Sequence, residues 1–239
     1  MPGGGLSRII AWAVHALTAS GVVIGLLAIL AVLKGDARET LLWLGLALAI
    51  DGLDGPLARR FEVRRLLPRF DGAALDLVVD YFTYVVVPAL FLYQFGYFPE
   101  GWALTVTAFI LATSLYIFAN VDMKTEDNYF VGFPAIWNVF ALYVYVLDPP
   151  KAATLAVTIA LGLASFSPAK FLHPLRVREG RPITLAALVV WSVTSLALVI
   201  STPDRPMPAL IAWLLASAWL LAQSLRRTFR GPEQPLPAE

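Results

Sequence analysis

Four aspartates stand at helical spacing inside two apolar stretches of the chain. Asp51 and Asp54 are three residues apart, and Asp76 and Asp80 are four apart, so each pair would lie on one face of a helix. An aspartate at the centre of a membrane helix costs about 2.5–3.5 kcal/mol on insertion scales. Four carboxylates in an apolar setting therefore need a polar cavity, bound cations, or both.

The neighbouring residues indicate what chemistry these carboxylates could do. Oxygen ligands without His or Cys favour Mg²⁺ or Mn²⁺, and four carboxylates suit two divalent ions, an arrangement that clamps an in-line displacement at phosphorus. Gly55 and Gly72 would let a ligand approach the backbone. Arg59 could offer a phosphate a forked set of donors. The pattern therefore predicts a diphosphate site at the membrane surface.

Each of these features also has a simpler interpretation. A single intramembrane aspartate can relay protons or pair helices, Arg59 can anchor a helix end, and Gly72 can serve helix packing. Asp71 lies outside the pattern, and we expect it only to cap the following helix. A cation-coupled transporter would also use intramembrane aspartates, and this other class of protein stays open as an alternative.

The rest of the chain consists of apolar stretches that could hold these residues in a membrane. Of the 239 residues, 59% are hydrophobic and 15% charged, whereas an average soluble domain is about 25% charged. This composition excludes an ordinary soluble enzyme, a disordered chain and a nucleic-acid-binding protein. Gly21 and Gly25 in the first stretch predict a close helix contact, unless they are incidental. The predicted spans are residues 9–33, 40–58, 71–95, 102–120, 130–147, 151–166, 183–201 and 207–225.

The distribution of basic residues orients these spans. With the N-terminus inside, fourteen of the 18 Lys and Arg residues fall on the cytoplasmic side and four outside. We therefore expect an all-α polytopic membrane protein with about eight transmembrane helices and with both the N- and C-termini in the cytoplasm. Residues 1–225 would form a single transmembrane domain, with its motif at 51–80. Residues 226–239 would form a disordered cytoplasmic tail.

The two aspartate pairs are part of a longer pattern. The run Asp51-Gly-Leu-Asp54-Gly55-Pro-Leu-Ala58-Arg59, followed by Gly72-Ala-Ala-Leu-Asp76-Leu-Val-Val-Asp80, resembles the signature of the CDP-alcohol phosphotransferases, or CDP-alcohol phosphatidyltransferases. All eight fixed positions of that signature are filled. The resemblance implies transfer of a substituted phosphate from a CDP-linked donor to an alcohol, with release of CMP.

The resemblance also implies a role for each matched residue. The metal-binding positions correspond to Asp51, Asp54, Asp76 and Asp80, and the last of these also corresponds to the general base, the catalytic residue. The positions around the CDP moiety and its phosphates correspond to Gly55, Ala58, Arg59 and Gly72. Two divalent cations, Mn²⁺ or Mg²⁺, would be the cofactors.

A twelve-residue spacer, residues 60–71, and eight predicted spans are similar to one branch of the family, the bacterial phosphatidylcholine synthases. The segment 124–134 is similar as well. This resemblance implies CDP-diacylglycerol and choline as substrates, membrane lipid as a partner and no nucleic acid, and it leaves a homodimer open. It implies a multi-pass protein of the bacterial inner membrane with its active site facing the cytoplasm. Serine or another alcohol stays open as the acceptor.

A choline site would need aromatic faces and a carboxylate for the quaternary ammonium group. Aromatic residues follow Asp80 and recur on later spans, and the loop at 122–128 carries Glu126 and Asp127 but only one lysine. Aromatic residues also pack cores and line membrane interfaces, so packing is the alternative. The predicted choline contacts are Tyr81, Tyr84, Tyr116, Glu126 and Trp137.

Overall fold

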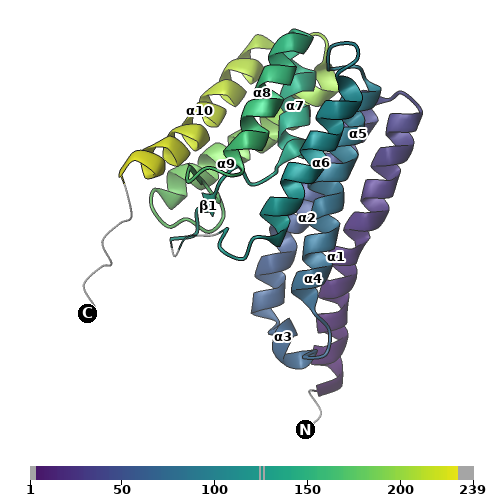
Figure 1. Ribbon diagram of the computed structural model, residues 1–239. Coiled ribbons are helices and arrows are strands. Elements are labelled where there is room, and N and C mark those ends of the chain that lie inside the picture. Colours follow the sequence, from purple (N-terminus) through teal and green to yellow (C-terminus); the bar gives the residue numbers. More distant parts are fainter. Residues whose placement is uncertain (1–3, 124, 126, 231–239) are drawn as a thin grey trace. The chain divides into compact units, whose positions relative to one another are not determined.

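The computed structural model describes residues 4–123, 125 and 127–230, and most of these residues are helical (Figure 1). They divide into two compact units. The first comprises the described residues up to 107 and those at 136–145, and the second comprises the described residues at 108–135 and from 146 to 230. The helices α6 (Ala103–Ala119) and α7 (Trp137–Leu147) contribute residues to both units.

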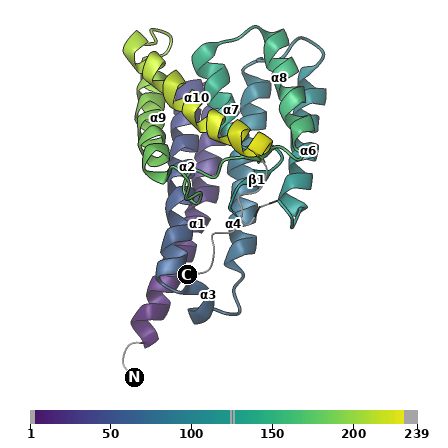
Figure 2. The same ribbon diagram turned by 90° about the vertical axis from the view of Figure 1, so that its left-hand side faces the viewer.

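The first unit is built on the long N-terminal helix α1 (Gly4–Leu33). In Figures 1 and 2 this helix runs alongside α2 and α4. Five elements of the unit contact α1 in the described part of the chain. They are α2 (Ala37–Arg60), α3 (Val63–Leu66), α4 (Gly72–Asp80), the π-helical segment η1 (Tyr81–Val86) and α5 (Val87–Gln94).

The carboxylate of Asp71 caps α4. It accepts hydrogen bonds from the backbone N–H groups of Ala73 and Ala74, at 3.0 and 3.1 Å. The predicted cap is thereby confirmed.

Two glycines allow α1 to approach the α4–η1 segment closely. A Cβ atom on Gly21 would lie 2.5 Å from Cγ1 of Val79, and one on Gly25 would lie 2.5 Å from Cε1 of Phe82. Both distances are shorter than van der Waals contact, so larger residues would push the helices apart. The close helix contact predicted for this pair is confirmed.

The second unit contains α8 (Lys151–Ala164), α9 (Arg181–Ser201) and α10 (Met207–Arg230). The last two helices lie side by side (Figure 2), and Nε1 of Trp213 donates to Oγ of Ser195 at 2.9 Å between them. A short antiparallel ladder joins β1 (Phe130–Val131) to β2 (Lys170–Phe171). The end of α10 holds this ladder, because Oγ1 of Thr228 accepts the N–H of Lys170 at 2.8 Å.

Among the described residues, five helical segments are long and apolar enough to span a membrane, and α6, α7 and α8 are shorter apolar helices. The predicted span at 130–147 is wrong at its start, because residues 130–131 form β1 and α7 begins at Trp137. Gly132 has a φ of +80°, and a residue before proline, here Phe133, is disfavoured in the helical region. At the other end of the chain, α10 continues to Arg230 rather than ending at residue 225. The remainder of the predicted tail, residues 231–239, lies outside the described residues, and the single domain stays a prediction.

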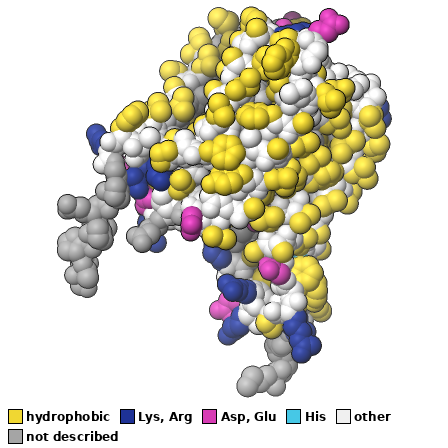
Figure 3. All heavy atoms as spheres, in the orientation of Figure 1, with side chains coloured by type: hydrophobic (Ala, Val, Ile, Leu, Met, Phe, Trp, Pro, Cys, Tyr) yellow, Lys and Arg dark blue, Asp and Glu magenta, His cyan; other side chains and the backbone are white. Residues whose placement is uncertain are grey.

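The surface of the helices is largely apolar, as Figure 3 shows for one face. Basic side chains gather where α2, α3 and α4 meet, at the lower end of the first unit in that view. The exposed arginines of this region are Arg59, Arg60, Arg64, Arg65 and Arg69. Apolar helices with a basic end are typical of proteins embedded in a bilayer.

Candidate active site

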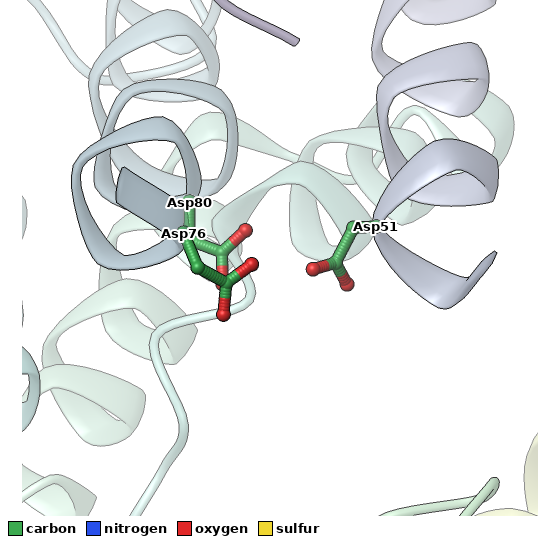
Figure 4. A group of neighbouring side chains, drawn as sticks. All are labelled: Asp51, Asp76 and Asp80. Carbon is green, nitrogen blue, oxygen red and sulfur yellow. The ribbon is translucent and has the colours of Figure 1, made fainter. Parts of the chain in front are cut away.

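Three of the four predicted aspartates face one another in the first unit. Asp51 projects from α2 towards Asp76 and Asp80 on α4 (Figure 4), and one carboxylate oxygen of each lies within 4.8 Å of the other two. Magnesium binds oxygen at about 2.0–2.1 Å, so ligands on opposite sides of one ion are about 4 Å apart. This carboxylate triad therefore fits around a divalent cation with a small adjustment.

The fourth aspartate, Asp54, lies beside the triad and is held by a different helix. It is only 6% exposed, and Oγ1 of Thr18 on α1 donates to its Oδ2 at 2.7 Å. A small cavity of about 10 Å³ is lined by Asp54 together with Asp51 and Asp80. That volume is about the size that one water molecule needs. The four predicted carboxylates thus meet around one centre, although three of them form the tight group.

The hydroxyl of Tyr84 holds one member of the triad in place. Tyr84 is buried on η1, and its Oη donates to Oδ2 of Asp51 at 2.6 Å. A hydrogen bond of this kind fixes the orientation of a carboxylate that would otherwise rotate, and such partners tune metal ligands in proteins. The π-helical turn begins directly after Asp80, and irregular turns of this type are frequent at functional sites.

A larger cavity of about 600 Å³ lies next to the carboxylates. This volume is within the range of about 300–1,000 Å³ that small-molecule sites occupy. Asp54 and Asp76 line it, and Arg64 and Arg65 of α3 add positive charge. All the residues predicted to surround the CDP moiety line it as well, namely Gly55, Ala58, Arg59 and Gly72. The structure therefore brings the predicted nucleotide residues together beside the predicted metal ligands.

Comparison with known proteins decides the family. No protein-family model matches the chain. The phosphatidylcholine synthase of Pseudomonas aeruginosa strain PAO1 is 49% identical over 221 residues, which is 92% of each chain. The enzyme of that name from Rhizobium johnstonii is 38% identical over 88% of this chain and 87% of its own, and that from Borreliella burgdorferi is 33% identical over 94% and 97%. The chain belongs to the phosphatidylcholine synthase family.

Membership in the phosphatidylcholine synthase family makes the chain a phosphatidyltransferase, an enzyme of phospholipid biosynthesis. Together with the five apolar helices of spanning length, it indicates a multi-pass membrane protein. The sequence resemblance to CDP-alcohol phosphotransferases is in keeping with this family, and the motif that carries it coincides with the two cavities described above.

The residues predicted to contact choline belong to different units of the structure. Tyr81, Tyr84 and Trp137 belong to the first unit, and Trp137 is fully buried. Tyr116 belongs to the second unit, where its ring packs 4.7 Å from that of Phe166. The remaining contact, residue 126, lies outside the described residues. The aromatic cage stays a prediction, with Tyr81 nearest in sequence to the carboxylate triad.

Asp127, which the sequence offered as a second acidic residue for a cationic substrate, is paired with an arginine of the chain itself. Nε of Arg227 on α10 donates to its Oδ2 at 2.5 Å, and the guanidinium lies 5.7 Å from the centre of the Tyr129 ring. Burial alone would raise the pKa of Asp127. Hydrogen bonds from Arg227 and Thr125 outweigh that effect and hold the pKa below its usual value.

Two polar residues of α1 belong to the site and were not predicted. Thr18 binds Asp54, and His15 lines the larger cavity. They are three residues apart and therefore share a face of the helix. The available signal was the presence of polar side chains within the apolar run at 9–33, since polar groups inside membrane helices are commonly functional.

Proposed function

We propose that this protein condenses CDP-diacylglycerol with choline to give phosphatidylcholine and CMP by a metal-assisted in-line displacement. The observation that carries the proposal is the adjacency of two cavities, one lined by three predicted metal ligands and the other by all the predicted nucleotide contacts. The similarity to the phosphatidylcholine synthase of P. aeruginosa supports the choice of product.

The four aspartates are proposed to hold two divalent cations, Mg²⁺ or Mn²⁺. Their all-oxygen donor set suits these hard ions, and the 4.8 Å spacing within the triad of Asp51, Asp76 and Asp80 is compatible with a shared ion. Asp54, which lines both cavities, would contribute to the second ion. When bound, the cations would neutralise the diphosphate and stabilise the charge that develops on the leaving CMP.

The protein's own residues would align the reactants. Arg59 would hold a phosphate oxygen of the donor, while Gly55 and Gly72 leave the backbone open to it. Asp80 would accept the proton of the choline hydroxyl as that oxygen forms a bond to the phosphorus carrying diacylglycerol. The bond between this phosphorus and the CMP oxygen breaks, and CMP takes the bonding electron pair. Tyr84 would keep Asp51 oriented throughout.

The acyl chains of the donor would stay in the bilayer while its diphosphate enters at the cytoplasmic face. The exposed arginines around the connection between α2 and α4 support this orientation, because basic residues concentrate on the cytoplasmic side. The proposed topology keeps eight spans, both termini in the cytoplasm and the bacterial inner membrane as the location. The choline ammonium would lie near Tyr81, which directly follows Asp80.

The decisive experiment measures CMP and phosphatidylcholine formation by the purified protein with CDP-diacylglycerol. We expect CMP release to require choline, to stop when EDTA removes divalent cations, and to return on addition of Mg²⁺ or Mn²⁺. Serine serves as the matched acceptor. CMP release that depends on serine and not on choline would contradict the proposed acceptor, and activity undiminished by EDTA would contradict the role of the cations.

A further inference from the structure

His15 lies at a well-defined position on the wall of the larger cavity. Its side chain is 8% exposed, and two aromatic rings pack against the imidazole. The centre of the Phe70 ring is 4.5 Å away and that of Trp12 is 6.0 Å away. These rings are apolar neighbours that fix the imidazole without satisfying its nitrogens.

Gly72 provides the space that the imidazole occupies. A Cβ atom at position 72 would lie 2.6 Å from Cε1 of His15 and 3.3 Å from its Nδ1. Any side chain there would force the ring to move. The glycine of the motif therefore accommodates His15, in addition to any role in letting a ligand reach the backbone.

One nitrogen of the imidazole is left for a ligand. Nε2 is buried and has no hydrogen-bond partner among the described residues. Buried polar atoms in proteins nearly always have a partner, so an unsatisfied one calls for an explanation. His15 lines the same cavity as Gly55, Ala58 and Arg59, the residues matched to the CDP moiety. A molecule bound in that cavity can supply the missing partner.

Metal binding explains this nitrogen less well than contact with the nucleotide. The close group of metal-ligating side chains in the described part of the chain contains Asp51, Asp76 and Asp80 but not His15. The cavity beside His15 is lined by the guanidinium groups of Arg59, Arg64 and Arg65 and by the carboxylates of Asp54, Glu62 and Asp76. The guanidinium groups offer the donors that nucleotide phosphates need.

We propose that His15 is a binding residue for the CDP moiety of the lipid donor, with Nε2–H donating a hydrogen bond to one of its oxygens. Gly72 sets the position of the imidazole. This inference rests on the proposed function, because it takes CDP-diacylglycerol to be the occupant of the larger cavity. It adds α1 to the two helices that carry the family motif.

The test compares His15→Ala with His15→Gln, which retains a neutral donor, and His15→Phe, which retains a ring against Trp12 and Phe70. For the alanine and phenylalanine variants we expect KM for CDP-diacylglycerol to rise by about threefold to tenfold, the effect of losing one hydrogen bond. KM for choline should stay unchanged, and the glutamine variant should recover most of the loss. The inhibition constant of CMP, used as a probe of the same cavity, should rise in parallel.

A purely structural role for His15 makes different predictions. If His15→Phe binds CDP-diacylglycerol and CMP as wild type does, or if all three variants change both KM values equally, the proposal is overturned. Thermal unfolding of each purified variant separates lost binding from lost folding. Should the alanine variant not fold, the phenylalanine and glutamine variants still decide the matter.

The link to Gly72 is tested with a double-mutant cycle. Gly72→Ala should raise KM for CDP-diacylglycerol in the wild-type background, and the same change should cost much less in the His15→Ala background, where the clash is gone. Equal costs in both backgrounds would overturn the positioning role of Gly72.

Failure of the proposed function would look different from failure of this inference. If serine rather than choline drives CMP release, the proposed acceptor is wrong. The His15 variants can then be compared in the serine assay, where KM for CDP-diacylglycerol tests the nucleotide contact independently.

Discussion

One group of carboxylates in the first unit and one carboxylate in the second unit have opposite kinds of neighbour. In the first unit, Asp51, Asp76 and Asp80 face one another, with one oxygen of each within 4.8 Å of the others. In the second unit, Asp127 faces Arg227, whose Nε–H donates to it at 2.5 Å. One arrangement brings like charges together, and the other joins opposite charges.

This difference distinguishes a ligand-binding site from an ion pair that only stabilises the fold. The pair in the second unit joins α10 to the loop before β1 and is complete within the chain. The triad places three acidic groups around a common point, and a cation bound among them would offset their mutual repulsion. Charge satisfied internally stabilises a fold, whereas charge that needs an external partner indicates ligand binding.

The largest effect that would test this contrast is expected from Asp80→Asn. The variant keeps the size of the side chain but removes the proposed base and a metal ligand, so turnover should fall by about 10²–10⁴-fold or more. Choline-dependent CMP release by the folded, membrane-inserted protein measures it. Asp71→Asn is the matched control, because Asn also caps helices and the Asp71 carboxylate accepts hydrogen bonds from backbone N–H groups of α4. Turnover of Asp80→Asn close to that of the control would contradict the role of Asp80.

A smaller loss is expected when the triad keeps its carboxylates but loses the hydroxyl that orients one of them. Tyr84→Phe removes the 2.6 Å hydrogen bond to Asp51. We expect the concentration of Mg²⁺ or Mn²⁺ that gives half-maximal activity to rise by about 10–100-fold, as is typical for partners of metal ligands. Tyr93→Phe, on an exposed position of α5, is the control. A change in KM for choline without a change in metal dependence would instead support Tyr84 as a choline contact.

Much of the carboxylate site could be predicted from sequence spacing. On any helix, Asp51 shares a face with Asp54, and Asp76 shares a face with Asp80. The contributions of His15 and Thr18 could not be predicted in this way. They depend on how α1 is rotated against α2 and α4. The spacing of residues within one helix does not predict how that helix packs against others. Tyr84 was recognised as an aromatic residue, but its bond to Asp51 depends on the π-helical turn, which a 3.6-residue period does not describe.

The structure of residues 130–136 could not be predicted from the sequence either. This segment is apolar enough to extend the predicted span, yet it forms β1 and a turn before α7. Hydropathy reports burial and carries no information about the positive φ of Gly132 or about pairing with β2, about forty residues later in the chain. The long helices were predicted well because length and apolarity are sufficient to specify them.

The ion pair of the second unit is tested with Arg227→Met. This variant should lose stability but keep its catalytic activity. The arginine side chain is 9% exposed and that of Asp127 is 28% exposed, so removing the cation leaves a partly buried carboxylate without its main partner. We expect a loss of about 1–3 kcal/mol in the free energy of unfolding. KM for CDP-diacylglycerol should stay unchanged from wild type. Unfolding in denaturant and steady-state kinetics measure the two effects. A raised KM with unchanged stability would assign Arg227 to the active site.

The smallest expected effect is the pH dependence of that same pair. The pKa of Asp127 is lowered from its usual 3.8, so its stabilising contribution is fully present above that value and is lost as the pH falls through the lower, folded-state pKa. We compare the melting temperatures of wild type and Asp127→Asn between pH 7 and pH 3. The difference, about 2–4 °C for each kcal/mol in a chain of this size, should be constant down to about pH 5 and shrink below about pH 4, as wild-type Asp127 becomes protonated. A difference that instead grows as the pH falls would show that Asp127 is not stabilised as the anion. The charge of Asp127 would then not be satisfied within the chain, and its contrast with the triad would be lost.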